Sequence, residues 1–110
     1  MEPVLVTDSG GLRTLQLNRP EAFNALDLAA KQALLAAVED SAADHAVRAV
    51  LLIGTGRGFC VGQDLREFQE LRSTGATPAE LFSTVAEHYS PISRALATMD
   101  KPVVAAVNGE

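Results

Sequence analysis

The feature that most restricts the fold of this chain is a short apolar run that leads directly into a glycine-rich segment. Residues 49–53 read Ala-Val-Leu-Leu-Ile, and glycines follow at positions 54, 56, 58 and 62. A run without polar alternation is typical of a strand covered on both faces, as in a parallel sheet. A glycine-rich turn between such a strand and a helix directs backbone N–H groups toward one point, which can hold an anion. The segment predicts an α/β fold.

The N-terminal third has the pattern of a hairpin followed by a helix. Pro3–Asp8 and Leu12–Leu17 are rich in β-type residues and flank a Ser-Gly-Gly turn, which predicts two antiparallel strands. Asp27 is a good N-cap for a helix over Leu28–Ala43. Spacing places four apolar side chains on one face of this helix, those of Leu28, Leu35, Val38 and Ala42.

Two further helix starts follow the glycine-rich segment. Asp64 and Glu67 have N-cap and N3 spacing and predict a short helix through Leu71. Thr77-Pro-Ala-Glu80 is a capping box with proline at N1, and Leu81, Val85, Ile92 and Leu96 follow at helical intervals. Pro91 is expected to bend or split this second helix. A last strand, Val103–Val107, precedes an Asn-Gly turn at 108–109, so the element order is that of an α/β domain.

Length and charge limit the classes of function. The chain has 110 residues and a formal net charge of −5, which allows one core and argues against nucleic-acid or anionic-membrane partners. No apolar window is long enough to span a bilayer. One cysteine, Cys60, indicates a reducing, cytoplasmic setting without an internal disulfide. His45 and His88 lack companions at metal-ligand spacing, so no metal site is expected.

The glycines themselves fit neither common nucleotide loop. The order G-x-G-x-G departs from the dinucleotide fingerprint, the helix begins late, and no Lys-Ser or Lys-Thr pair follows. A better candidate is Gly62-Gln63-Asp64, where the N–H of Gln63 would emerge beside a helix N-terminus. One such donor supplies half of an oxyanion hole, which stabilises charge on a carbonyl oxygen. The alternative is a plain glycine-rich connection.

Three segments together resemble one family. Asn18–Leu26 (NRPEAFNAL), Gly58–Leu65 (GFCVGQDL) and Lys101–Gly109 (KPVVAAVNG) look like consecutive signatures of the crotonase superfamily, the enoyl-CoA hydratase/isomerase family. The resemblance covers essentially the whole chain. Within the family, Gly62–Leu65 and His88–Ile92 look most like the phenylacetate-pathway isomerase branch.

The resemblance implies a fold, a substrate and site residues. The fold is the N-terminal part of a spiral of ββα units, over residues 1–110 without a second domain, and the usual assembly is a homotrimer or hexamer. The substrate is an acyl-CoA thioester, with coenzyme A as part of the substrate and no separate cofactor. The catalytic donor would be the backbone N–H of Gln63. Residues implied on the coenzyme A side are Ala22, Asn24, Ala25, Gly62, Asp64, Leu65 and Arg66.

Several roles stay open at this stage. Arg66 is either a cation near the coenzyme A phosphates or a solvated helix residue, and Arg19 either contacts ligand or orders the turn after its strand. Phe68 and Leu71 either line an acyl pocket or belong to the core. In the family, the second oxyanion donor and the acid/base carboxylates would lie beyond Glu110. The chain is therefore expected to be an incomplete acyl-CoA isomerase or hydratase, and the alternative is a non-catalytic CoA-binding remnant or a subunit of a related complex.

Overall fold

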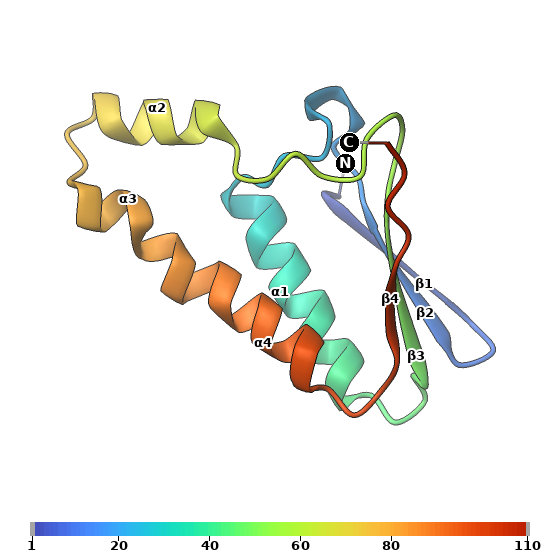
Figure 1. Cartoon of the computed structure of the whole chain (residues 1–110). Helices are drawn as coiled ribbons and strands as arrows, with labels where there is room; N and C mark the ends of the chain where they lie inside the picture. The colour runs from blue at the N-terminus through green and yellow to red at the C-terminus, as the bar shows by residue number, and fades with distance from the viewer. Residues whose placement is uncertain (1, 110) are drawn as a thin grey trace.

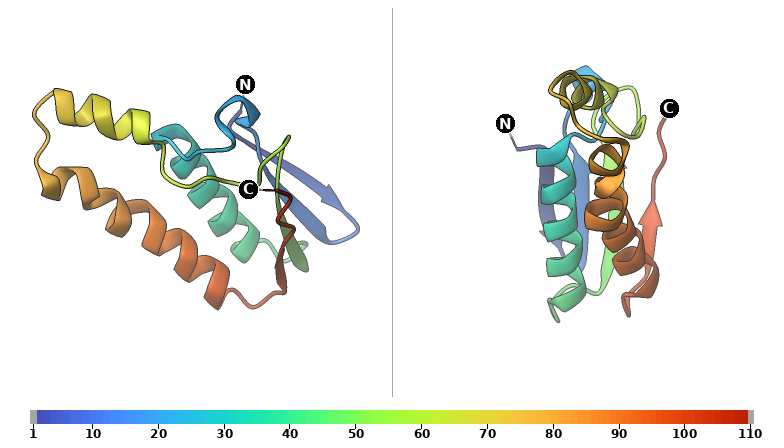
Figure 2. Two further views of the ribbon diagram at one scale, coloured as in Figure 1. Left: turned by 45° about the horizontal axis from the view of Figure 1, so that its top comes forward. Right: turned by 90° about the vertical axis from the view of Figure 1, so that its left-hand side faces the viewer.

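The chain folds into one mixed sheet with its helices packed on a single face. The computed structural model describes residues 2–109. The helices lie to one side of the sheet in Figure 1 and in the left view of Figure 2. The strands are β1 (Val4–Ser9), β2 (Leu12–Leu17), β3 (Ala49–Gly54) and β4 (Val103–Ala105). The helical elements are η1 (Pro20–Ala22), α1 (Leu28–Ala43), α2 (Leu65–Ser73), α3 (Pro78–Thr84), η2 (Val85–Tyr89) and α4 (Ser90–Thr98).

The sheet has the order β1-β2-β3-β4, and only its first pair is antiparallel. β1 and β2 form the predicted hairpin, joined by Gly10 and Gly11 with φ of +58° and +88°, a conformation that suits a tight two-residue turn. β3 and β4 are each added in parallel after a helical crossover. The α/β class predicted from the sequence is confirmed.

The core lies between the sheet and α1 and α4. Side chains of β2 alternate, so that Leu15 and Leu17 face the helices, and Val50 of β3 lies beside them. From α1 the core receives Ala30, Leu34 and Val38. The four apolar residues that spacing places on one face of α1 are only partly buried, because Leu28 is 46% exposed and Ala42 is exposed. The helix turns a face centred on Leu34 and Val38 toward the sheet, and Lys31 and Ser41 share that buried face.

The expectation that β3 is covered on both faces was also wrong. Val50 is fully buried, but Leu51, Leu52 and Ile53 are half-buried, since the helices cover only one face of the sheet (Figure 2). The strand is therefore apolar on both faces, although the helices within residues 2–109 cover only one of them.

Proline interrupts the long C-terminal helix as predicted, and the interruption has a specific form. α3 continues into α4 through a π-helical turn, η2, in which the N–H of Ser90 donates to the carbonyl of Val85. Pro91 cannot donate to the preceding turn, and a wider turn is one way to accommodate this. Because the π turn changes the helical phase, Val85 is 50% exposed rather than part of the core, whereas Ile92 is buried.

α2 and α3 form an arm that projects from the sheet (Figure 1). α2 has no buried residue, and Thr84 is the one buried residue of α3. The aromatic rings of Phe68 and Phe82 meet edge to face, with centroids 5.8 Å apart. The arm is therefore held to the body by few apolar contacts, which makes its polar contacts important.

Candidate functional site

The turn at residues 62–64 leaves one backbone donor without an internal partner. Gly62 has φ +98°, as its predicted role in a turn requires. Leu26 N–H donates to Gly62 O at 2.8 Å, and Asp64 N–H donates to Leu26 O at 2.9 Å. These two bonds form a parallel bridge between Leu26 and Gln63, in which the N–H of Gln63 itself points away from Leu26. Within residues 2–109 this N–H donates no hydrogen bond.

A cleft of about 780 Å³ lies beside this turn, and Gln63 lines it. Six of the residues expected at the site share this cleft: Ala22, Ala25, Gln63, Asp64, Leu65 and Arg66. Leu65 is 71% exposed and Arg66 is exposed. The structure thus brings together one side of the predicted site from two segments separated by about forty residues in sequence. Arg19, Glu21, Phe23 and Val61 complete the wall.

Arg19 orders the turn after β2. Of the two roles predicted for it, ligand contact or ordering of this turn, the structure shows the second. Its guanidinium donates to Ala25 O and, at 3.1 Å, to a carboxylate oxygen of Asp64. Asp64 also accepts from Arg66 N and Glu67 N, so it caps α2 as predicted. Burial raises the pKa of Asp64, but the hydrogen bonds from Glu67 N, Arg19 and Arg66 N outweigh burial and leave the pKa below its ordinary value.

Asn24 lies behind the cleft wall, and its side chain fixes the loops around it. Its side-chain oxygen accepts from Arg19 N, and its NH₂ group donates to the carbonyls of Thr55 and Gly58. Both Phe23 and Asn24 have left-handed backbone, with φ of +51° and +57°. Asparagine tolerates this conformation, whereas a bulky residue rarely adopts it. A contact between coenzyme A and the backbone here remains a prediction.

The glycine-rich loop that opens with Gly54 has a packing role. A Cβ on Gly54 would lie 2.4 Å from Phe59 O, so the close approach of two backbone segments requires glycine there. Carbonyl oxygens of the loop accept from Asn24 and, at Gly56, from Asn108. The loop therefore presents several carbonyls to its neighbours, which agrees with the rejection of a nucleotide loop.

A buried polar cluster lies behind Gln63, and sequence reasoning missed it. The cluster consists of Lys31, Gln63, Glu67, Thr84, His88 and Tyr89, and we call it the Lys31 cluster. The Lys31 ammonium, on a residue 2% exposed, donates to Thr84 Oγ1 at 2.8 Å, Gln63 Oε1 at 3.1 Å and Glu67 Oε2 at 3.2 Å. The one available signal was a lysine on the face of α1 that also carries Leu34 and Val38.

The other members complete the cluster. Gln63 Oε1 also accepts from Tyr89 OH at 2.6 Å, and Gln63 Nε2 donates to Glu67 Oε2 at 2.8 Å. His88 Nδ1 lies 2.8 Å from Thr84 Oγ1. Glu67, expected from the sequence only as the N3 residue of α2, has a mostly buried carboxylate, and its second oxygen accepts from Leu28 N at 2.6 Å. Burial raises the pKa of Tyr89 to about 12, with smaller contributions from Cys60 and Glu67.

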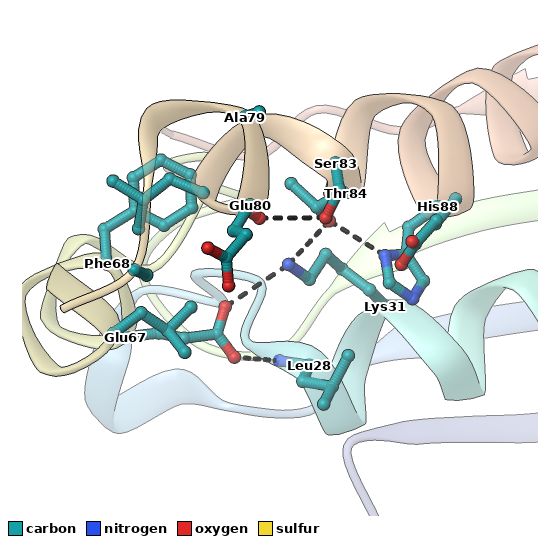
Figure 3. A pocket seen from close by; sticks show the side chains of 13 residues that line it. Leu28, Lys31, Glu67, Phe68, Ala79, Glu80, Ser83, Thr84 and His88 are labelled. Carbon is teal, nitrogen blue, oxygen red and sulfur yellow. Dashed lines mark hydrogen bonds and ion pairs between the residues drawn. The ribbon is translucent and has the colours of Figure 1, made fainter. Parts of the chain in front are cut away.

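A second cavity, of about 610 Å³, lies between the start of α1 and the α2–α3 arm. Figure 3 shows the Lys31 ammonium at its wall, joined to Thr84 and Glu67. Phe68 and Leu71 line this cavity. This position is compatible with the first of the two roles considered for them, which were to line an acyl pocket or to belong to the core. The Lys31 cluster therefore contributes to the wall of this cavity through Lys31, Glu67, Thr84 and His88, and to the first cleft through Gln63.

The chain is similar to known proteins along nearly its whole length. The chain is 40% identical, over 99% of its length, to 1,2-epoxyphenylacetyl-CoA isomerase of Escherichia coli strain K12, and covers 41% of that protein. It is 34% identical, over 96% of its length, to a trans-2-decenoyl-[acyl-carrier-protein] isomerase of Streptococcus mutans, of which it covers 40%. The crystal structure of an enoyl-CoA hydratase from Mycobacterium smegmatis superposes with a TM-score of 0.83 at 36% identity, covering 96% of this chain and 39% of that one.

These matches confirm the resemblance stated from the motifs, including the crotonase fold, and they define its extent. The chain spans about 40% of the length of the relatives it matches. The sequence model of the enoyl-CoA hydratase/isomerase family matches residues 12–110, from β2 to the end of the sequence. The chain belongs to the enoyl-CoA hydratase/isomerase family.

Proposed function

We propose that this chain provides one half of an acyl-CoA site, in which the Gln63 N–H binds the thioester oxygen. The single observation that carries the proposal is that Gln63, whose N–H donates no hydrogen bond within residues 2–109, lines the 780 Å³ cleft. Removal of a proton next to a thioester places negative charge on this oxygen, and a fixed donor stabilises that charge. Loss of one such donor typically raises the barrier by about 3 to 4 kcal/mol.

The two cavities suggest where the ends of the substrate lie. The first cleft carries the exposed cation of Arg66, which suits a phosphate of coenzyme A. The second cavity is lined by Phe68, Leu71 and Leu81, which suit an apolar acyl group. We propose isomerisation or hydration of an enoyl-CoA by the whole protein, and the E. coli relative makes an aromatic acyl group of the phenylacetate pathway the first candidate.

Calorimetric titration of the chain with acetyl-CoA tests the coenzyme A half of the proposal. We expect saturable binding that weakens in Arg66→Glu, because the added carboxylate repels the phosphates. A carboxylate in the first turn of α2 does not oppose the helix dipole, so the fold should persist. Arg72→Glu is the matched control, because it makes the same charge change on the same helix. Arg72 is exposed and does not line the cleft.

The outcomes separate the possibilities. Equal weakening in both variants would show that binding depends on net charge rather than on the cleft, and absence of binding by the unaltered chain would contradict the proposal. A second candidate is a CoA-binding protein without turnover. Binding of acetyl-CoA without conversion of an enoyl-CoA would support that candidate.

A further inference from the structure

We propose that Lys31 is a positioning residue that fixes the orientation of the Gln63 peptide through the Gln63 side chain. The inference rests on the proposed function, in which the Gln63 N–H is the oxyanion donor. Lys31 itself is not among the residues that line the cleft with Gln63. It acts from behind the turn.

The Gln63 side chain has every hydrogen-bonding capacity in use. Its oxygen accepts from Lys31 and Tyr89, and its NH₂ group donates to Glu67 and to Asp64 O. An amide with two donors and two acceptor sites filled has one permitted orientation. Because the parallel bridge to Leu26 holds the backbone on the other side, the peptide that carries the donor is restrained from two directions.

Lys31 is the centre of this arrangement because its three protons reach three separate elements. They go to Gln63 in the turn, Glu67 in α2 and Thr84 in α3. No fully buried side-chain nitrogen or oxygen within residues 2–109 lacks a partner, so no fully buried polar atom of the cluster is unpaired. Fully satisfied buried networks restrict a site to one conformation, and loss of one member leaves the others unpaired.

An oxyanion donor needs this kind of restraint. Its contribution comes from being oriented before charge develops, without reorganisation during the reaction. Tolerances of this kind are about 0.5 Å and 10–20°, and supporting side chains normally set them. The Lys31 cluster supplies such support on the side of Gln63 that faces away from the first cleft.

The test uses backbone order parameters of the free chain, measured by ¹⁵N relaxation. In the unaltered chain, we expect the Gln63 amide to have an order parameter of about 0.85, and in Lys31→Met below about 0.6. Methionine preserves most of the volume and removes the three donors. Lys101→Met is the matched control, because Lys101, the chain's second lysine, donates to the carbonyls of Ser41 and Asp44 at the far end of α1.

A rigid Gln63 amide in folded Lys31→Met, or equal loosening in Lys101→Met, would overturn the proposal. If Lys31→Met does not fold because Glu67 is left without its cation, the double variant Lys31→Met with Glu67→Gln carries the same test without a buried charge. The same two outcomes apply to it.

A ligand measurement separates this inference from the proposed function. Hexadienoyl-CoA is a thioester whose absorption moves to longer wavelength when its carbonyl oxygen accepts hydrogen bonds. We expect the shift on binding to the unaltered chain, and a smaller shift at similar affinity in Lys31→Met. Absence of binding or of the shift in the unaltered chain would contradict the oxyanion role, while the order parameters would still decide whether Lys31 holds Gln63. A full shift in Lys31→Met would contradict the positioning role.

Discussion

Glycine has two different physical roles in the segment after β3. Gly54 is required by space, since a Cβ would lie 2.4 Å from Phe59 O, whereas Gly62 has open space but φ +98°. We expect Gly62→Ala to cost about 1–2 kcal/mol of unfolding free energy through backbone strain alone. Gly54→Ala should cost more, because two backbone segments must separate. Urea denaturation of both variants checks this order, and a smaller loss for Gly54→Ala would contradict it.

Asp64 makes a stability contribution that depends on pH. Its pKa in the folded chain is below the ordinary value of 3.8, so the stabilisation is complete above that value and is lost as pH falls through the folded pKa. We expect Asp64→Asn, which retains a good N-cap, to be less stable at pH 7 by about 1 to 3 kcal/mol. The difference should shrink below pH 4. Denaturation at several pH values measures it, and a constant difference would argue against the hydrogen bonds of the ionised carboxylate with Glu67 N, Arg19 and Arg66 N as its source.

Tyr89 gives the opposite pH dependence. Its pKa is raised to about 12 in the folded chain, whereas tyrosine in the unfolded chain ionises near pH 10. The contribution of Tyr89 to the free energy of unfolding is therefore fully present below pH 10 and is lost as the pH rises from 10 to 12. The chain has one tyrosine and no tryptophan, so tyrosinate absorbance reports this group alone. We expect a midpoint near 12 in the folded chain. A midpoint near 10 while the fold persists would show that the hydroxyl is not buried with Gln63.

The helices differ in how firmly the structure holds them. α1 contributes Ala30, Leu34 and Val38 to the core, whereas α2 buries no residue. We expect amides of α2 and α3 to exchange hydrogen through local opening, with lower opening free energies than amides of α1 and β2. Native-state exchange at increasing denaturant concentration measures both. Equal values across all four elements would mean that the arm opens only with the whole domain.

Local signals predicted most of the elements. The Gly10-Gly11 turn, the Asp27 cap and the Thr77 capping box each depend on a few adjacent residues, and each appears as predicted. The sequence did not predict which face of α1 is buried or that Val85 is exposed. The first depends on where the sheet lies, and the second on a π turn whose position Pro91 alone does not fix. Element patterns are local, whereas helical phase is set by tertiary contacts.

At the scale of the whole molecule, the candidate site was predictable to the extent that it follows sequence motifs. Gln63 and its neighbours were brought together as the motifs indicated. The rest of the Lys31 cluster was not predicted, because its members other than Gln63 come from α1, α2, α3 and η2 and form no motif. Glu67 illustrates the difficulty: a glutamate at N3 of a short helix has a sufficient local explanation, and only the fold reveals its contact with Lys31.

The projecting arm also has an evolutionary consequence. α2 and α3 line the 610 Å³ cavity but add little to the core. Substitutions on surfaces away from buried networks usually change stability by less than about 0.5 kcal/mol. Leu71, which is 43% exposed on the arm, can therefore be exchanged with little selection on folding. Under the proposed function, exchanges of this kind would alter the acyl group that fits the cavity and would leave the backbone donor at Gln63 in place.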